Sequence, residues 1–135
     1  MSIPARLAAR VVFLLALVGS LLVVAGPADA AWKGTLTWRG AVTQACRVPV
    51  EGNRVRVNVR LNNTNGSEDS SGGLNRVVGG QAGNSWTYTR NTHAGEVSNV
   101  ASLVFAQGVK VYLLIGSRVG ITDEKIIKIS TLPRC

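Results

Sequence analysis

Residues 54–61 alternate polar and apolar side chains without exception, in the order Arg-Val-Arg-Val-Asn-Val-Arg-Leu. A period of two places every second side chain on the same face of a β-strand, so this segment predicts a strand with one buried and one solvent-facing side. The same valines would be scattered around the circumference of a helix. The chain must therefore form a sheet that has one face covered.

Other segments rich in β-branched and aromatic residues supply the partners of this strand. Val109–Ile115 is apolar on nearly both faces and is expected to be a central strand. Turn-forming residues, mostly glycines, separate the remaining predicted strands, which are Ile126–Ile129, Ser85–Arg90, Thr35–Trp38, Val42–Val48, Arg76–Val78 and Leu103–Ala106. Seven or eight short strands predict an all-β fold. We expect a small antiparallel β-sandwich, with a small β-barrel as second choice.

Two segments are interpreted in another way, although the first of them overlaps the predicted strand Leu103–Ala106. Residues 96–106 are the best helical candidate, although no window shows a convincing helical period. Asn62–Gly73 contains no apolar residue and is predicted to be an exposed, mobile loop. Its part Asn62–Asp69 is rich in the oxygen atoms that calcium prefers but lacks the EF-hand spacing. A solvated loop is favoured, and calcium binding by this loop stays open.

Residues 1–30 have the three parts of a secretory signal peptide. Arg6 and Arg10 precede the apolar stretch 11–25, and Ala28-Asp29-Ala30 follows with the small residues that signal peptidase prefers. The alternative is an uncleaved membrane anchor, but this stretch of 15 residues, interrupted only by Gly19 and Ser20, is shorter than the roughly 20 residues that span a bilayer. We therefore predict an exported protein with a single β-domain at 31–135 and no transmembrane span after signal removal.

The chain contains two cysteines, Cys46 and Cys135. An even pair in an exported protein usually forms a disulfide, so an intramolecular Cys46–Cys135 bond is predicted. The alternative is two free thiols or an intermolecular link through Cys135. Two cysteines and one histidine do not make a zinc site, and we expect neither a metal nor a cofactor.

Catalysis finds little support in the sequence. His93, the single histidine, lies in a polar stretch that resembles a turn, and no nucleophile-elbow pattern is present. The adjacent acids Glu68/Asp69 and Asp123/Glu124 lie in polar segments, where carboxylates are usually only solvated. We expect the protein not to be an enzyme.

Positive charge is the strongest indication of function. The chain has 15 Lys and Arg against 7 Asp and Glu, a formal net charge of +8. Arg54, Arg56 and Arg60 share the polar face of the alternating strand, where guanidinium groups can bind phosphate or carboxylate. The alternative is an ordinary solvated strand face. Nucleic acid is an unexpected partner for an exported protein.

The tryptophans are candidates for a contact surface or for the core. Trp86, Tyr88 and Arg90 fall on one face of a predicted strand. Trp32 and Trp38 bracket an N-terminal strand that docks either on its own domain or on a partner.

From these patterns we predict a secreted, extracellular binding domain. Its partner would be an anionic cell-surface polymer or another exported protein, bound through the arginine and aromatic residues named above. One alternative is a structural adaptor in an extracellular assembly, such as a secreted toxin complex, that inserts its N-terminal strand into a neighbour. Another is a small secreted inhibitor or antimicrobial effector. Strand order and oligomeric state are not predicted.

Overall fold

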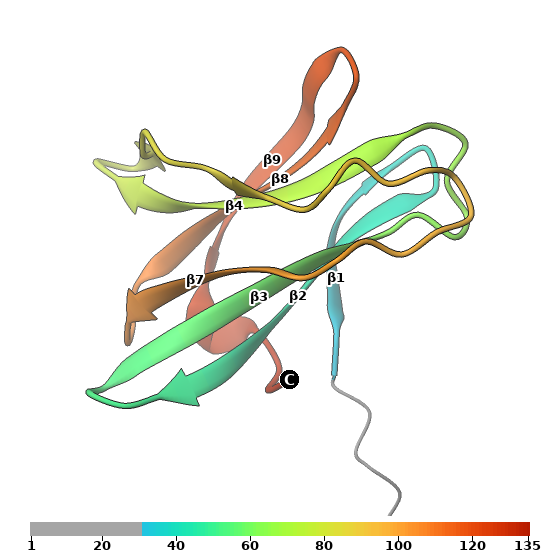
Figure 1. Cartoon of the computed structure of the whole chain (residues 1–135). Helices are drawn as coiled ribbons and strands as arrows, with labels where there is room; N and C mark the ends of the chain where they lie inside the picture. The colour runs from blue at the N-terminus through green and yellow to red at the C-terminus, as the bar shows by residue number, and fades with distance from the viewer. Residues whose placement is uncertain (1–30) are drawn as a thin grey trace, which may run out of the picture.

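The computed structural model describes residues 31–135, and the predicted signal peptide lies outside them. Within this range the chain forms two antiparallel sheets that face one another across a hydrophobic core (Figure 1). The fold is all-β, as predicted. The described residues contain no α-helix, and none of their helices is long and apolar enough to cross a membrane.

Sheet A has the strand order β1-β2-β3-β7. Its strands are β1 (Lys33–Trp38), β2 (Ala41–Val50), β3 (Arg54–Asn62) and β7 (Ala101–Ala106). β3 lies between β2 and β7 and has the predicted alternation, since its four apolar residues are at most 3% exposed. β1 pairs with β2 of the same chain, so the N-terminal strand docks on its own sheet.

Sheet B has the order β5-β4-β8-β9, with β6 paired to β4 beside β5. Its strands are β4 (Ser70–Val78), β5 (Gln81–Ala82), β6 (Thr87–Tyr88), β8 (Lys110–Ser117) and β9 (Gly120–Lys128). β8 is central, as predicted, because it pairs with β4 on one side and β9 on the other. The β8–β9 hairpin extends beyond the rest of the molecule at the top of Figure 1.

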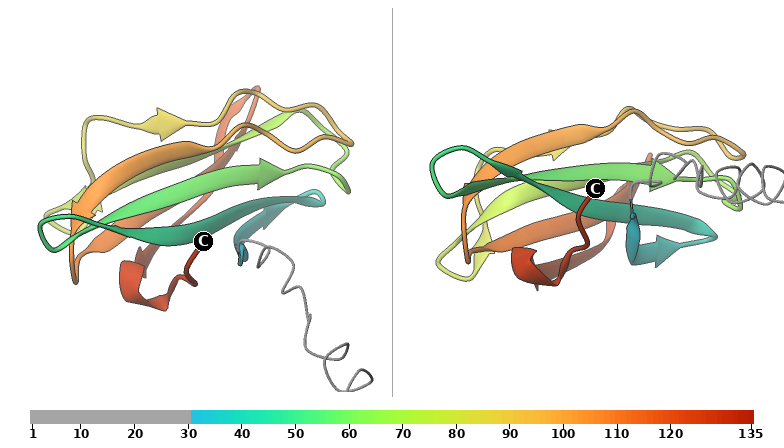
Figure 2. Two further views of the ribbon diagram at one scale, coloured as in Figure 1. Left: turned by 60° about the horizontal axis from the view of Figure 1, so that its bottom comes forward. Right: turned by 90° about the horizontal axis from the view of Figure 1, so that it is seen from below.

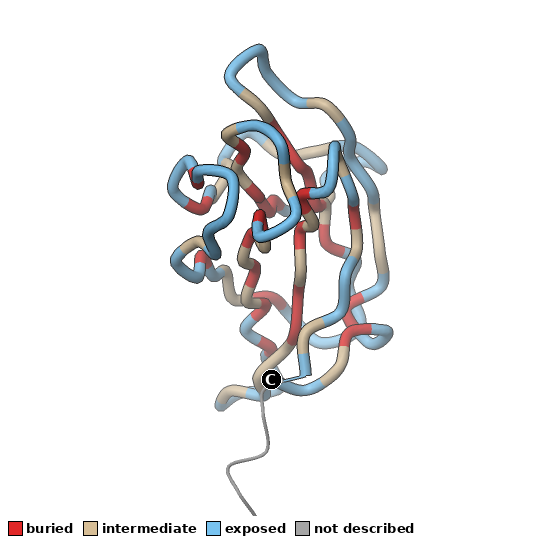
Figure 3. The backbone as a smooth tube through the Cα atoms, turned by 90° about the vertical axis from the view of Figure 1, so that its right-hand side faces the viewer, coloured by how far each residue is buried: buried red, intermediate tan, exposed pale blue. Residues whose placement is uncertain are grey.

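The core lies between the inner faces of the two sheets. Sheet A contributes alternate residues of β3 together with Phe105, and sheet B contributes Leu74, Leu113 and Ile115. Figure 3 shows buried positions along the facing sides of both layers and exposed positions in the connecting loops. The glycine-free alternation of β3 is what fixes its inner face toward this core.

The C-terminal segment completes sheet A. After the 3₁₀ turn Ile129–Thr131, the backbone pairs in parallel with Arg47, whose N–H donates to the Pro133 carbonyl at 2.9 Å. The predicted Cys46–Cys135 disulfide is present and closes a loop with a sequence separation of 89. Figure 2 shows the C-terminus beside β2. The tail therefore occupies the part of the β2 edge that β1 leaves free.

Several predicted element boundaries were wrong. The segment 96–106 is not helical, since Ala101–Ala106 forms strand β7. The predicted strand Ser85–Arg90 is reduced to the two residues of β6, and the strand predicted at Ile126–Ile129 begins at Gly120 and ends at Lys128. The β9 residues 120–125 escaped prediction because an edge strand with charged side chains on both faces carries no apolar alternation.

The prediction that Asn62–Gly73 is an exposed loop was correct only for its middle part, where Thr64, Asn65, Ser67 and Glu68 are exposed and lie outside any strand. β4 begins at Ser70, and both Ser70 and Asn63 are buried. The Asn63 amide donates hydrogen bonds to the carbonyls of Glu68 and Thr92, which holds the turn against the neighbouring loop. Small and polar residues here are buried because they bond to backbone groups, a role that leaves no apolar signal in the sequence.

Candidate functional site

Arg54, Arg56 and Arg60, which we call the arginine face, lie on the outer side of sheet A. Each alternates with a buried β3 residue, so all three side chains point away from the core, as the sequence predicts. Within residues 31–135, no carboxylate lies within ion-pair distance of these three arginines. Their charge is therefore not neutralised by the described part of the chain.

Arg56 stands in an apolar setting. Its cross-strand neighbours on the same face are Val48 of β2 and Val104 of β7, both half-buried. Arg54, two residues away, donates from Nε to the Glu51 carbonyl at 3.1 Å. Successive outward positions of a strand are about 6–7 Å apart, so one extended anionic chain can contact both guanidinium groups.

Arg60 is held more firmly than the other two arginines. Its guanidinium carbon lies 4.3 Å from the centre of the Trp32 ring, and its Nε donates to the Gln44 side-chain oxygen at 2.8 Å. Burial lowers the pKa of Arg60, which nevertheless stays protonated at neutral pH. The structure thus unites two predicted residues, Trp32 and Arg60, that are 28 positions apart in the sequence.

A second group of predicted residues lies on the outer side of sheet B. The rings of Trp86 and Tyr88 stack with their centres 6.0 Å apart, and Tyr112 meets Trp86 edge-on at 5.5 Å. We call these three residues the aromatic surface. Tyr112 was not predicted as a site residue because its strand was expected to be buried on both faces.

Trp38 and Arg90, the remaining predicted site residues, belong to neither the arginine face nor the aromatic surface. Trp38 packs against the hydrophobic core, which is the alternative the sequence had left open for it. Arg90 is exposed, and its backbone N–H donates to the Asn99 side chain. The arginine face and the aromatic surface belong to the outer sides of different sheets, so the core separates them. They do not form one continuous site.

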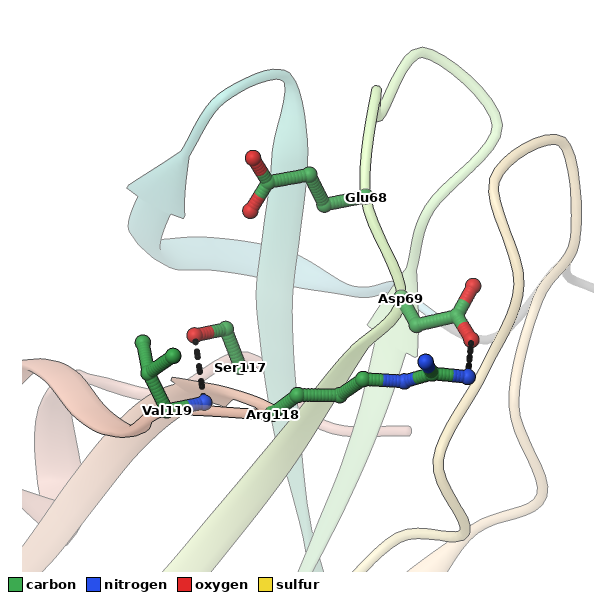
Figure 4. A pocket seen from close by; sticks show the side chains of 5 residues that line it. All are labelled: Glu68, Asp69, Ser117, Arg118 and Val119. Atoms are coloured by element: carbon green, nitrogen blue, oxygen red, sulfur yellow. Dashed lines mark hydrogen bonds and ion pairs between the residues drawn. The ribbon is translucent and has the colours of Figure 1, made fainter.

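Asp69 organises a third group at the end of the molecule that carries the β8–β9 turn. Its carboxylate hydrogen-bonds to His93 Nδ1 at 2.9 Å and accepts from Arg118 at 3.3 Å and from Asn91 at 3.4 Å. Figure 4 shows the Arg118 side chain extending to the Asp69 carboxylate in a pocket that these residues line, while the side chain of the neighbouring Glu68 points away from Asp69. Glu68 forms its ion pair with Arg39 instead. We call Asp69, His93 and Arg118 the Asp69 cluster.

The carboxylate of Asp69 and the imidazole of His93 stabilise each other's charged form. The hydrogen bond from His93 is the largest cause that lowers the pKa of Asp69, and the same bond raises the pKa of His93. The expectation that these adjacent acids are merely solvated was therefore wrong for Asp69, whereas Glu68 forms an exposed ion pair with Arg39. Sequence reasoning missed this pairing because 24 residues separate Asp69 from His93, and only the two adjoining loops bring them together.

The chemistry available to His93 is limited by its neighbours. Asp69 occupies Nδ1, and among residues 31–135 no hydroxyl group hydrogen-bonds to the other ring nitrogen. The same residues contain no group of three or more His, Cys, Asp or Glu side chains arranged to hold a metal ion. The visible role of the cluster is to tie together the loop before β4, the loop after β6 and the β8–β9 turn.

Comparison of the chain with family models, with curated proteins and with solved structures found no match in any of the three. The case for a function therefore depends on the geometry of these surfaces.

Proposed function

We propose that this chain is an exported, non-enzymatic domain that binds anionic polymers through the arginine face. The observation that carries the proposal is the set of three outward arginines on one strand with no carboxylate partner in the described part of the chain. Positive and negative side chains are usually interspersed on a solvated protein surface, whereas the charged side chains on the outer face of β3 are all positive.

The surroundings of Arg56 favour binding. Arg56 is exposed, but Val48 and Val104 pair with it on either side, so an anion bound to its guanidinium would lie beside apolar side chains, and this less polar setting would strengthen the attraction. Arg60 is already oriented by Trp32 and Gln44, which reduces the side-chain entropy lost on binding. Export, inferred from residues 1–30, makes phosphate- or carboxylate-bearing surface polymers the partners within reach.

The proposal is tested by titrating the protein with polyphosphate and with polygalacturonate at low and physiological ionic strength. Arg56→Glu should weaken binding by about tenfold or more, since a charge-assisted hydrogen bond contributes about 1.5–3 kcal/mol. Its thermal midpoint should stay near that of the wild type, because Arg56 is exposed. Binding by the wild type should also weaken as salt is added.

Lys125→Glu is the matched control. It makes the same change in charge at an exposed position of β9, on the other sheet, and should leave binding largely intact. Equal losses in the two variants would mean that only net charge matters. Failure of the wild type to bind either polymer, or unchanged binding by Arg56→Glu, would refute the proposal.

A further inference from the structure

We propose that the aromatic surface is a second binding site, which takes a pyranose oligosaccharide by stacking the sugar against Trp86 and Tyr88. This site lies across the core from the arginine face and does not depend on the function proposed above. The polarised C–H bonds on one side of a pyranose ring complement the negative face of an aromatic ring.

The rings are held in place before any ligand arrives. Tyr88 pairs through its backbone with Gly73 of β4, and a Cβ at Gly73 would lie 3.0 Å from the Tyr88 ring. Trp86 is half-buried between Tyr88 and Tyr112, which contact it from two directions. Such a fixed surface loses little conformational freedom on binding.

The surface remains open to solvent even though it covers an apolar residue. Leu114 is 1% exposed although it lies on the outer side of sheet B, opposite Gly73. Tyr88 nevertheless keeps 49% of its surface accessible. A role limited to covering Leu114 would not need the exposed part of the Tyr88 ring, so this part is available to a ligand.

Polar groups at the border of the surface match sugar hydroxyls. Glu124 of β9 pairs with Leu114 and therefore lies on the same outer face, where its carboxylate is the main cause that raises the pKa of Tyr112. A carboxylate has more acceptor positions than one hydroxyl can fill, so Glu124 can also accept from a ligand hydroxyl. A carboxylate at the border favours a sugar over a purely apolar protein surface, which would leave that charge without a partner on burial.

The experiment is isothermal titration of the protein with cellohexaose and with chitohexaose, two oligosaccharides that present flat pyranose faces. The wild type should bind at least one of them. Tyr88→Ala should weaken binding about tenfold, whereas Tyr88→Phe, which keeps the ring, should bind nearly as well as the wild type. Glu124→Gln changes an exposed side chain without removing its bulk and should weaken binding severalfold.

Arg56→Glu is the control that separates the two proposals, because it should retain full sugar binding. Absence of binding to both sugars at millimolar concentration would overturn this inference and leave the polyanion proposal standing. Binding that persists in both Tyr88→Ala and Glu124→Gln would also overturn it. The inference would likewise be overturned if light scattering found that the wild type is a dimer and Tyr88→Ala a monomer. The aromatic surface would then bind a second copy of the chain. If Tyr88→Ala does not fold, the sugar binding of Glu124→Gln provides the test instead.

Discussion

Replacing both cysteines by alanine, as Cys46→Ala/Cys135→Ala, should reduce the free energy of unfolding by about 4–5 kcal/mol. The disulfide joins residues with a sequence separation of 89. The chain-entropy relation for a closed loop of about 90 residues gives about 4.6 kcal/mol at 25 °C. That is a large share of the total stability of a small domain, which is about 5–15 kcal/mol.

The loss should act through the unfolded state because the native tail has other attachments. The Cys135 N–H donates to the Arg47 carbonyl at 3.0 Å, and Ile129 and Leu132 are each 2% exposed in the core. The folded variant should therefore keep its tail docked. Its urea m-value should rise, since the unfolded chain without the cross-link exposes more surface.

The assay is equilibrium unfolding in urea, followed by far-UV circular dichroism, for the wild type and the variant. The wild type in excess reductant should approach the stability of the variant. A loss below about 1 kcal/mol would refute the chain-entropy argument for this protein. Rapid amide exchange of residues 129–135 in the folded variant would refute the claim that the tail stays docked.

Two further predictions concern pH and packing. The pKa of His93 is raised above 6.5 and that of Asp69 is lowered below 3.8. The stabilisation that His93 contributes is therefore complete below pH 6.5 and is lost as pH rises through its pKa in the folded protein. The stabilisation that Asp69 contributes is present above pH 3.8 and is lost as pH falls through its pKa in the folded protein. Thermal melts should show His93→Gln most destabilised relative to the wild type between these limits, with the difference narrowing at higher pH; a constant difference would contradict the pairing. Gly73→Ala places a Cβ 3.0 Å from the Tyr88 ring and should cost about 1–3 kcal/mol in urea unfolding, whereas the control Gly72→Ala, whose nearest atoms lie at 3.4 Å, should be tolerated. Equal stability of the two glycine variants would show that Gly73 is not needed for close packing.

Prediction from the sequence was most accurate where a side-chain pattern is compatible with only one type of secondary structure. The alternation in 54–61 gave the correct inner and outer faces of β3, because a period of two has no helical equivalent. Prediction from the sequence failed at Gly73, which is buried because β6 pairs with it and the Tyr88 ring approaches closely. Burial of that kind depends on a neighbour distant in the chain.

The candidate sites divide in the same way. Membership of the arginine face was readable from the sequence, since its three residues share one strand. Tyr112 joins the aromatic surface only because β4 pairs with both β6 and β8, which places it beside Trp86. The Asp69 cluster likewise forms only where two loops and a hairpin meet.

The sequence by itself determined the all-β class, the two faces of β3 and the cysteine pair, because each depends on local periodicity or on having a single possible partner. Only the tertiary structure decided the strand order, the docking of β1 on its own sheet and the separation of the arginine face from the aromatic surface. The physical reason is that strand pairing depends on contacts between residues far apart in the chain, and local side-chain pattern does not encode which edges meet.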